Sequence, residues 1–190
     1  LRHAAIIPVG GEYVTSDIAL GVRVSVDVAE KLKTDYVDLT FCDLAKPKDE
    51  EIALSRIDKK ETETVSKLYL AQIAQARSKE ILSLVNAELK KLGRDGMLPE
   101  GAVFVGGGSK ARNLIELAKS ELRLPCSIGF PEDQEYVTGT SVSDPGFAGA
   151  IGALLLSQRV GGMNKGRISI GAGIGGMKES AKKFFKFLLP

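Results

Sequence analysis

Two groups of residues in this sequence have types and spacing that suit the binding of a phosphate or a flat base. The first is the triplet Gly106-Gly107-Gly108, which follows an apolar run at residues 102–105 and precedes a helical pattern. Glycines between a strand and a helix leave backbone N–H groups exposed, with no Cβ in front of them. We therefore expect a ligand surface of main chain here. The alternative is a tight turn that only connects two elements.

The second group is a carboxylate and an ammonium, Glu30 and Lys33, on a predicted helix that Ser25 caps. The apolar face of this helix is marked by Val28, Leu32 and Tyr36. Residues three apart on a helix are surface neighbours. The pair can hydrogen-bond the hydroxyls and ring edge of a ligand, or it can be a solvated ion pair without a ligand.

The composition gives little support for a metal site, a catalytic triad or a disulfide framework. The only histidine is His3, and Cys42 and Cys126 are far apart with no metal-ligand spacing. A zinc site, a Ser/His/Asp triad and a disulfide framework are therefore not expected. No apolar run is long enough to span a bilayer, and we predict no signal peptide.

The elements that would position these groups alternate between strands and helices. Strands are expected over residues 1–9, 37–42, 52–57, 102–105 and 126–130, the fourth of them buried on both faces. Helices are expected over residues 14–20, 25–36, 62–92 and 111–124, and from Asp144-Pro145 onward. Because a strand at the very start of a chain needs neighbours, we expect the chain to be the C-terminal part of a longer protein.

The C-terminal segment, residues 159–190, has a different composition. Residues 159–176 are rich in glycine and predict a linker, and residues 177–190 predict an amphipathic helix. The residues expected to meet a membrane are Met177, Ala181, Lys182, Lys183, Phe184, Phe185, Lys186 and Leu188. An apolar face with a lysine rim suits a lipid surface, and the alternative is docking on the protein body or on a partner.

The charge is divided between the tail and the body. After Val160 there are six basic residues and one acidic residue, so this part carries +5, while the whole chain carries +2. The body therefore carries −3. A mildly acidic body argues against nucleic acid as a partner, because nucleic-acid binding needs a basic surface on the folded domain.

With these parts in order, the chain resembles the C-terminal half of the FtsA family of bacterial cell-division proteins, in the actin-like ATPase superfamily. The resemblance is carried by residues 7–19 (IPVGGEYVTSDIA), 29–33 (AEKLK), 105–108 (VGGG) and the helix from Asp144-Pro145. It implies an α/β fold of the ribonuclease H-like type, in which a mixed sheet with flanking helices carries an inserted α+β outer subdomain. The first lobe would lie before Leu1.

The resemblance also implies a division of the chain. Residues 1–23 and 100–158 would form the base subdomain of the large lobe, and residues 24–99 the outer subdomain. Residues 159–176 would be the linker, and residues 177–190 the membrane-targeting helix.

The same resemblance implies an ATP site with magnesium. Gly106, Gly107, Gly108 and Ser109 would line its adenosine side. Glu30 and Lys33 would reach the ribose and the adenine, and Gly10 and Gly11 would lie near the phosphates. The family's phosphate loops and magnesium ligands would lie before Leu1, so we expect no metal site in this chain and no ATP hydrolysis by it alone.

The partners that the resemblance implies are the C-terminal peptide of FtsZ, further copies in an actin-like polymer, and the anionic membrane. Lys67 and Arg77 match in position the basic residues that the family uses for the FtsZ peptide; the alternative is that both are solvated helix residues. The protein would act at the division site, on the cytoplasmic side of the bacterial membrane. The alternatives are a chaperone-like ATPase of the superfamily and a pilus-assembly adaptor of the PilM type.

Overall fold

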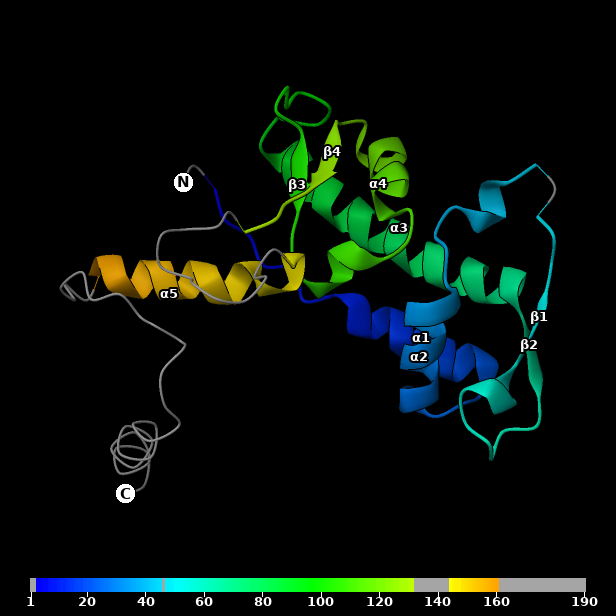
Figure 1. The fold of residues 1–190 in the computed structure, drawn as a ribbon. Helices are drawn as coiled ribbons and strands as arrows, with labels where there is room; N and C mark the ends of the chain where they lie inside the picture. The colour runs from blue at the N-terminus through cyan, green and yellow to red at the C-terminus, as the bar shows by residue number, and fades with distance from the viewer. Residues whose placement is uncertain (1–2, 46, 132–143, 161–190) are drawn as a thin grey trace, which may run out of the picture. The chain divides into compact units, whose positions relative to one another are not determined.

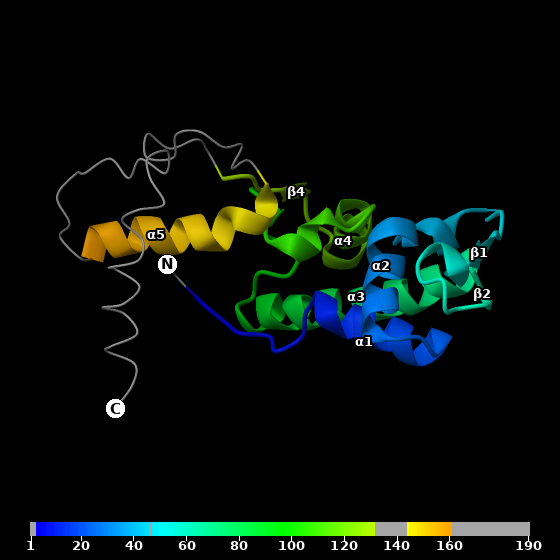
Figure 2. The same ribbon diagram turned by 60° about the horizontal axis from the view of Figure 1, so that its bottom comes forward.

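The computed structural model describes residues 3–45, 47–131 and 144–160, in two compact units, Leu1–Gly129 and Phe130–Pro190. The helices of the first unit are α1 (Gly11–Val22), α2 (Val26–Tyr36), α3 (Lys67–Lys91) and α4 (Leu114–Leu122). Short 3-10 helices are η1 (Phe41–Asp43), η2 (Leu54–Arg56) and η3 (Gly107–Lys110). Figure 1 and Figure 2 show α3 as the longest helix, along which the others are arranged.

The strands of the first unit form two small sheets. Strands β1 (Glu51–Ala53) and β2 (Thr64–Ser66) are antiparallel, with Ile52 opposite Val65. Strands β3 (Ala102–Phe104) and β4 (Cys126–Ile128) are parallel, with Val103 opposite Ser127. The mixture of a parallel and an antiparallel pair with packed helices is an α/β arrangement, as the sequence predicts, although the two sheets are separate.

The core lies between the helices. Helix α1 packs against α2 and α3, and α4 packs against α3 and β4. The largest fully buried side chains are aliphatic: Ile18, Leu32, Leu39, Leu54, Leu70, Leu117 and Leu122. Burial of each such side chain is worth about 1.5–3 kcal/mol, so this shared core fixes α1 against α2 and thereby positions Glu30 and Lys33.

Two helix starts follow the capping chemistry of the sequence. The Ser25 hydroxyl accepts a hydrogen bond of 3.3 Å from the backbone N–H of Val28, which confirms the predicted cap of α2. The Asp144 carboxylate accepts one of 2.7 Å from the N–H of Gly146. The predicted start of a helix at Asp144-Pro145 is therefore confirmed, and the first turn is the 3-10 helix η4 (Pro145–Phe147).

Two predicted strands are wrong. Residues 3–9 form no strand, because no described strand pairs with them, and Ile6 is 94% exposed. Residues 37–42 form a turn that runs into η1. The cause is local: the Asp38 carboxylate accepts hydrogen bonds from the Thr40 N–H at 2.9 Å and the Thr40 hydroxyl at 3.1 Å, which favours a turn over a ladder.

The other strand predictions need smaller corrections. Strand β3 is not buried on both faces, because Ala102 and Phe104 on one face are half-buried while Val103 on the other is 62% exposed. The strand expected over residues 52–57 ends at Ala53 and continues as η2. Residues 64–66, expected to be helical, form β2 instead, and α3 begins at Lys67. The strand expected over residues 126–130 is confirmed over its first three residues.

In the second unit the structure describes residues 130–131 and 144–160. After η4, helix α5 (Ala148–Val160) extends two residues into the segment predicted as a linker. The rest of the predicted linker and the whole predicted membrane helix, residues 161–190, lie outside the described residues. Among the helices that the structure describes, none has both the length and the apolar character to cross a bilayer.

Candidate functional site

Glu30 and Lys33 form an ion pair on α2, and Thr15 of α1 joins them. Lys33 Nζ lies 2.6 Å from Glu30 Oε2 and donates a 2.8 Å hydrogen bond to Thr15 Oγ1. The Thr15 hydroxyl in turn donates to Glu30 Oε2 at 2.5 Å. Thr15 is only 3% exposed, whereas Glu30 keeps 49% of its side chain exposed. The buried hydroxyl therefore holds a pair whose carboxylate still faces outward.

The same ammonium reaches the start of α1. Lys33 Nζ donates to the carbonyl oxygen of Gly11 at 3.3 Å, and a Cβ added to Gly11 would lie 4.0 Å from Nζ. Gly10 caps α1 without a side-chain hydrogen bond. A helix N-terminus with an ammonium beside it favours an anion, although Glu12 in the first turn opposes this.

The electrostatics keep Glu30 ionised. Partial burial acts to raise the pKa of Glu30, but the hydrogen bonds from Lys33 and Thr15 and the charge of Lys33 outweigh it, so that this pKa is lowered. At neutral pH the site therefore presents a carboxylate acceptor to a ligand hydroxyl. The three N–H groups of Lys33 are directed at Glu30, Thr15 and the Gly11 carbonyl, so a ligand acceptor has to replace one of these partners, of which Gly11 at 3.3 Å is the most distant.

The glycine triplet forms a turn that only glycine allows at its first residue. Gly106 has φ +89° and ψ 175°, a conformation open to glycine alone. The buried Ser109 hydroxyl donates to the Gly106 carbonyl oxygen at 2.7 Å and holds the turn closed. A Cβ added to Gly107 or Gly108 would meet nothing within 4 Å. These two glycines thus leave an open main-chain surface, which is what a flat ring needs.

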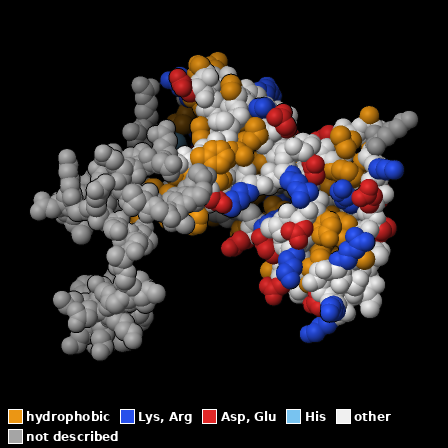
Figure 3. Space-filling view, viewed as in Figure 1, with side chains coloured by type: hydrophobic (Ala, Val, Ile, Leu, Met, Phe, Trp, Pro, Cys, Tyr) orange, Lys and Arg blue, Asp and Glu red, His pale blue; other side chains and the backbone are white. Residues whose placement is uncertain are grey.

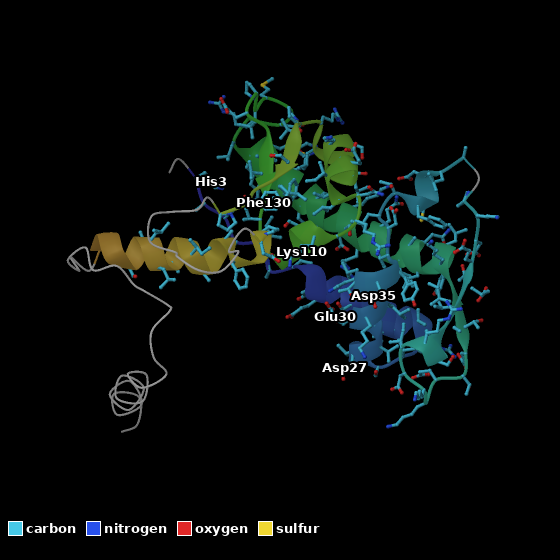
Figure 4. The ribbon with its side chains drawn as sticks, viewed as in Figure 1. His3, Asp27, Glu30, Asp35, Lys110 and Phe130 are labelled. Atoms are coloured by element: carbon cyan, nitrogen blue, oxygen red, sulfur yellow. The ribbon has the colours of Figure 1, made fainter. Side chains whose placement is uncertain are left out.

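Hydrogen bonds join the end of α2 to the segment that follows this turn. The Leu39 N–H donates to the Arg112 carbonyl oxygen at 3.2 Å, and the Asn113 amide donates to both oxygens of Asp38 at 2.9 Å. Figure 4 labels Glu30 on α2 and Lys110 at the end of η3, which lie in the same part of the molecule in that view. The structure thus brings Gly11, Glu30 and Lys33 into contact and ties the glycine turn to their helix.

Lys67 and Arg77 are separate from this cluster and from each other. Ten residues of helix place their backbones about 15 Å apart along α3. Lys67 Nζ lies 3.8 Å from Glu50 and 5.1 Å from the Phe41 ring centre. Arg77 is paired twice with Asp17 of α1, through Nε at 2.6 Å and Nη2 at 3.0 Å.

Carboxylates from two helices lie around Arg77 of α3. Figure 3 shows basic and acidic side chains interspersed over this face of the first unit. Arg77 illustrates the mixture, because its guanidinium also meets Glu80 Oε2 at 2.5 Å. Any acidic ligand of Arg77 has to compete with carboxylates that are already in place. Among the residues the structure describes, no cluster of three His, Cys, Asp or Glu side chains suits a metal ion.

Sequence reasoning missed three residues of the site. Thr15 lies one helical turn after Gly11 and so faces the same way, a spacing that the sequence contains. Asp38, two residues before Thr40, has the pattern of an Asx turn. Asn113 gives no signal, because its contact with Asp38 spans 75 residues of sequence.

The chain was compared with known proteins. The family model described as "Cell division protein FtsA" matches residues 1–152. The FtsA protein of Pseudomonas aeruginosa is 32% identical over 168 residues, which cover 86% of this chain and 39% of that protein. The FtsA protein of Neisseria meningitidis is 30% identical over 98% of this chain and 45% of its own length. The chain thus spans less than half the length of these curated relatives.

A solved structure shares the fold. The structure of MreB5 of Spiroplasma citri bound to ADP has a TM-score of 0.54 at 17% identity, covering 83% of this chain and 48% of that one. This likeness confirms the predicted actin-like fold class and carries no more than the fold. The family match over most of the chain decides the membership: the chain belongs to the FtsA family of cell-division proteins.

Proposed function

We propose that the first unit of this chain binds the adenosine part of ATP. The observation that carries the proposal is the network of Thr15, Glu30 and Lys33, whose Nζ also contacts the carbonyl of Gly11. It places one exposed carboxylate and one ammonium beside the start of α1, whose N-cap Gly10 makes no side-chain hydrogen bond. Glu30 accepts hydrogen bonds from the ribose hydroxyls, and Lys33 donates to the adenine edge in place of its 3.3 Å contact with Gly11.

The glycine turn supplies the second wall of the proposed site. Gly107 and Gly108 have open space in front of their Cα atoms, and Ser109 holds the turn from behind. The donor set therefore fits an adenosine group. The phosphates and magnesium would lie toward Gly10 and Gly11, where the helix N-terminus favours an anion. MreB5, which shares the fold, is described as bound to ADP.

A nucleotide titration with a matched lysine control tests this proposal. Lys33→Ala removes the ammonium of the network, whereas Lys31→Ala removes an exposed lysine from the same helix. We expect the affinity for ADP, measured by titration of the whole chain, to fall at least about fivefold in Lys33→Ala and to stay unchanged in Lys31→Ala. Equal loss in both variants, or in neither, contradicts the proposal.

We further propose that the protein tethers FtsZ to the membrane as an actin-like polymer, at the division site on the cytoplasmic side. Family membership supports this adaptor over a chaperone-like ATPase or a pilus-assembly relative. The lysine-edged apolar composition of residues 177–190 supports a lipid contact. Single tails of this kind bind weakly, so attachment would depend on many copies in one polymer. Deletion of residues 177–190 should release the chain from anionic vesicles; retention on them would contradict the tether.

The FtsZ contact is proposed at Lys67 and Arg77. Both side chains are partly exposed, and a guanidinium can pair an acidic peptide with two hydrogen bonds. Since Asp17 already occupies that geometry, the peptide has to displace it or pair with the Arg77 edge that now meets Glu80. Peptide binding at this place is therefore coupled to the α1–α3 contact.

A further inference from the structure

We infer that Asp38 and Asn113 form a clamp that sets the spacing between α2 and the glycine turn, so that they position both walls of the adenosine site without touching the nucleotide. This inference rests on the proposed function. The clamp consists of these two side chains and the backbone hydrogen bond from Leu39 to Arg112.

Asp38 contacts both a residue close to it in sequence and a residue that is distant in sequence. Its Oδ1 accepts from the Thr40 N–H at 2.9 Å and the Thr40 hydroxyl at 3.1 Å, which orients the carboxylate. Both of its oxygens then accept from the Asn113 amide at 2.9 Å. Asn113 Nδ2 thus lies 2.9 Å from each oxygen of a carboxylate that its own turn orients, so this three-centre contact fixes the position of the amide nitrogen.

Asn113 departs from its usual role in order to make this contact. It stands at the N-cap of α4, where an asparagine oxygen normally accepts from the first turn, but no such hydrogen bond forms. Its backbone is left-handed, with φ 60° and ψ 20°. Asparagine tolerates this conformation better than most residues, and the conformation aims its amide at Asp38 instead of at α4.

The clamp lies close to both walls in sequence. Asp38 follows Lys33 by five residues, just beyond the end of α2, and Asn113 follows Gly108 by five residues, just beyond the end of η3. Because α2 is a rigid helix and η3 is held by Ser109, a shift at the clamp moves Glu30 and Lys33 relative to the glycines. Ligands that contact both walls depend on that spacing.

The variant Asn113→Gly removes the hydrogen bonds of the clamp without adding backbone strain. Glycine adopts a positive φ at no cost but has no amide, so this variant removes the hydrogen bonds to Asp38 and little else. We expect ADP affinity of the whole chain to fall about tenfold. Hydrogen exchange at the Ser109 amide, which donates to Gly106 at 3.1 Å, should become faster. Unchanged affinity together with unchanged exchange overturns the clamp.

A charge swap gives a second, independent readout. Asn113→Asp sets two carboxylates against each other, and Asp38→Asn removes the charge, so each single variant should lose affinity. The double variant Asp38→Asn with Asn113→Asp restores one donor and one acceptor and should recover to within about threefold of the wild type. Additive losses in the double variant count against the clamp, provided that circular dichroism shows all variants folded.

The two proposals fail in different ways. If the wild-type chain binds no ADP, the proposed function fails at once, and with it the positioning role of the clamp. If the wild type binds and Lys33→Ala does not, but Asn113→Gly binds normally with normal exchange at Ser109, only the clamp fails.

Discussion

The Asp38 carboxylate accepts two hydrogen bonds of 2.9 Å from the amide of Asn113, across 75 residues of sequence. This contact joins the end of the helix that carries Glu30 and Lys33 to the end of the turn that carries Gly106–Gly108. The candidate site is therefore built from segments that are distant in sequence. Its geometry depends on polar contacts between them in addition to the aliphatic core.

The first prediction concerns how the contribution of Asp38 to stability changes with pH. Burial acts to raise the pKa of Asp38, but the hydrogen bonds from Asn113 and Thr40 outweigh it, so that this pKa lies below the ordinary 3.8. The contribution of Asp38 to stability is then complete above about pH 4, and it is lost as the pH falls through the lowered pKa. Urea unfolding should show wild type more stable than Asp38→Asn at pH 7, with a difference that shrinks toward pH 2. A difference that grows on acidification would contradict the ionised clamp.

The second prediction separates two neighbouring glycines. Gly106→Ala forces a Cβ into φ +89° and should lower the free energy of unfolding by about 1–3 kcal/mol. Gly107→Ala meets open space and should change it by less than about 0.5 kcal/mol, yet it should weaken ADP binding because its methyl group stands where the ring lies. Chemical denaturation and titration together check this. Normal ADP binding by folded Gly107→Ala would exclude the glycine wall.

The third prediction concerns Thr15, whose buried hydroxyl holds Glu30 and Lys33. Thr15→Val keeps the shape but removes the hydroxyl, and should weaken ADP binding roughly two- to tenfold. Thr15→Ser keeps the hydroxyl and should bind nearly as the wild type does. Equal affinities of the valine and serine variants, measured by titration, would remove Thr15 from the site.

The fourth prediction concerns Arg77, which is held by Asp17. Asp17→Asn keeps the shape but weakens this pair, so the affinity for an acidic FtsZ C-terminal peptide should rise about two- to fivefold, while Arg77→Ala should lose binding. Glu116→Gln, which removes an exposed carboxylate that pairs with Lys119 on α4, serves as the control for a general change in charge. Fluorescence anisotropy with the labelled peptide measures all three. Unchanged affinity in Arg77→Ala would place the peptide elsewhere.

Local chemistry made part of this fold predictable. The Ser25 cap, the Asp144-Pro145 helix start and the neighbouring positions of Glu30 and Lys33 follow from sequence spacing, and the structure confirms each of them. In these cases the partners lie within a few residues of each other, so the sequence spacing alone indicates the contact.

The failures have different physical causes. Alternation over residues 37–42 predicts a strand, but the Asp38 side chain competes for the backbone of Thr40 and turns the chain. The run at residues 102–105 predicts burial on two faces, but burial of a face depends on the layer packed against it, and Val103 of β3 is 62% exposed. The contact of Asp38 with Asn113 depends on the fold as a whole, and no local pattern indicates it.

The central claim is that bare main chain at Gly107 and Gly108 faces the adenosine of a bound nucleotide. The most direct measurement is an amide spectrum of the whole chain labelled with ¹⁵N-glycine, recorded as ADP is added. The amides of Gly11, Gly107 and Gly108 should shift together and saturate at one concentration, while those of Gly93 and Gly96, which stand in turns after α3, stay in place. Saturable shifts at Gly93 and Gly96 with none at Gly107 and Gly108, or no shifts at any glycine, would contradict it.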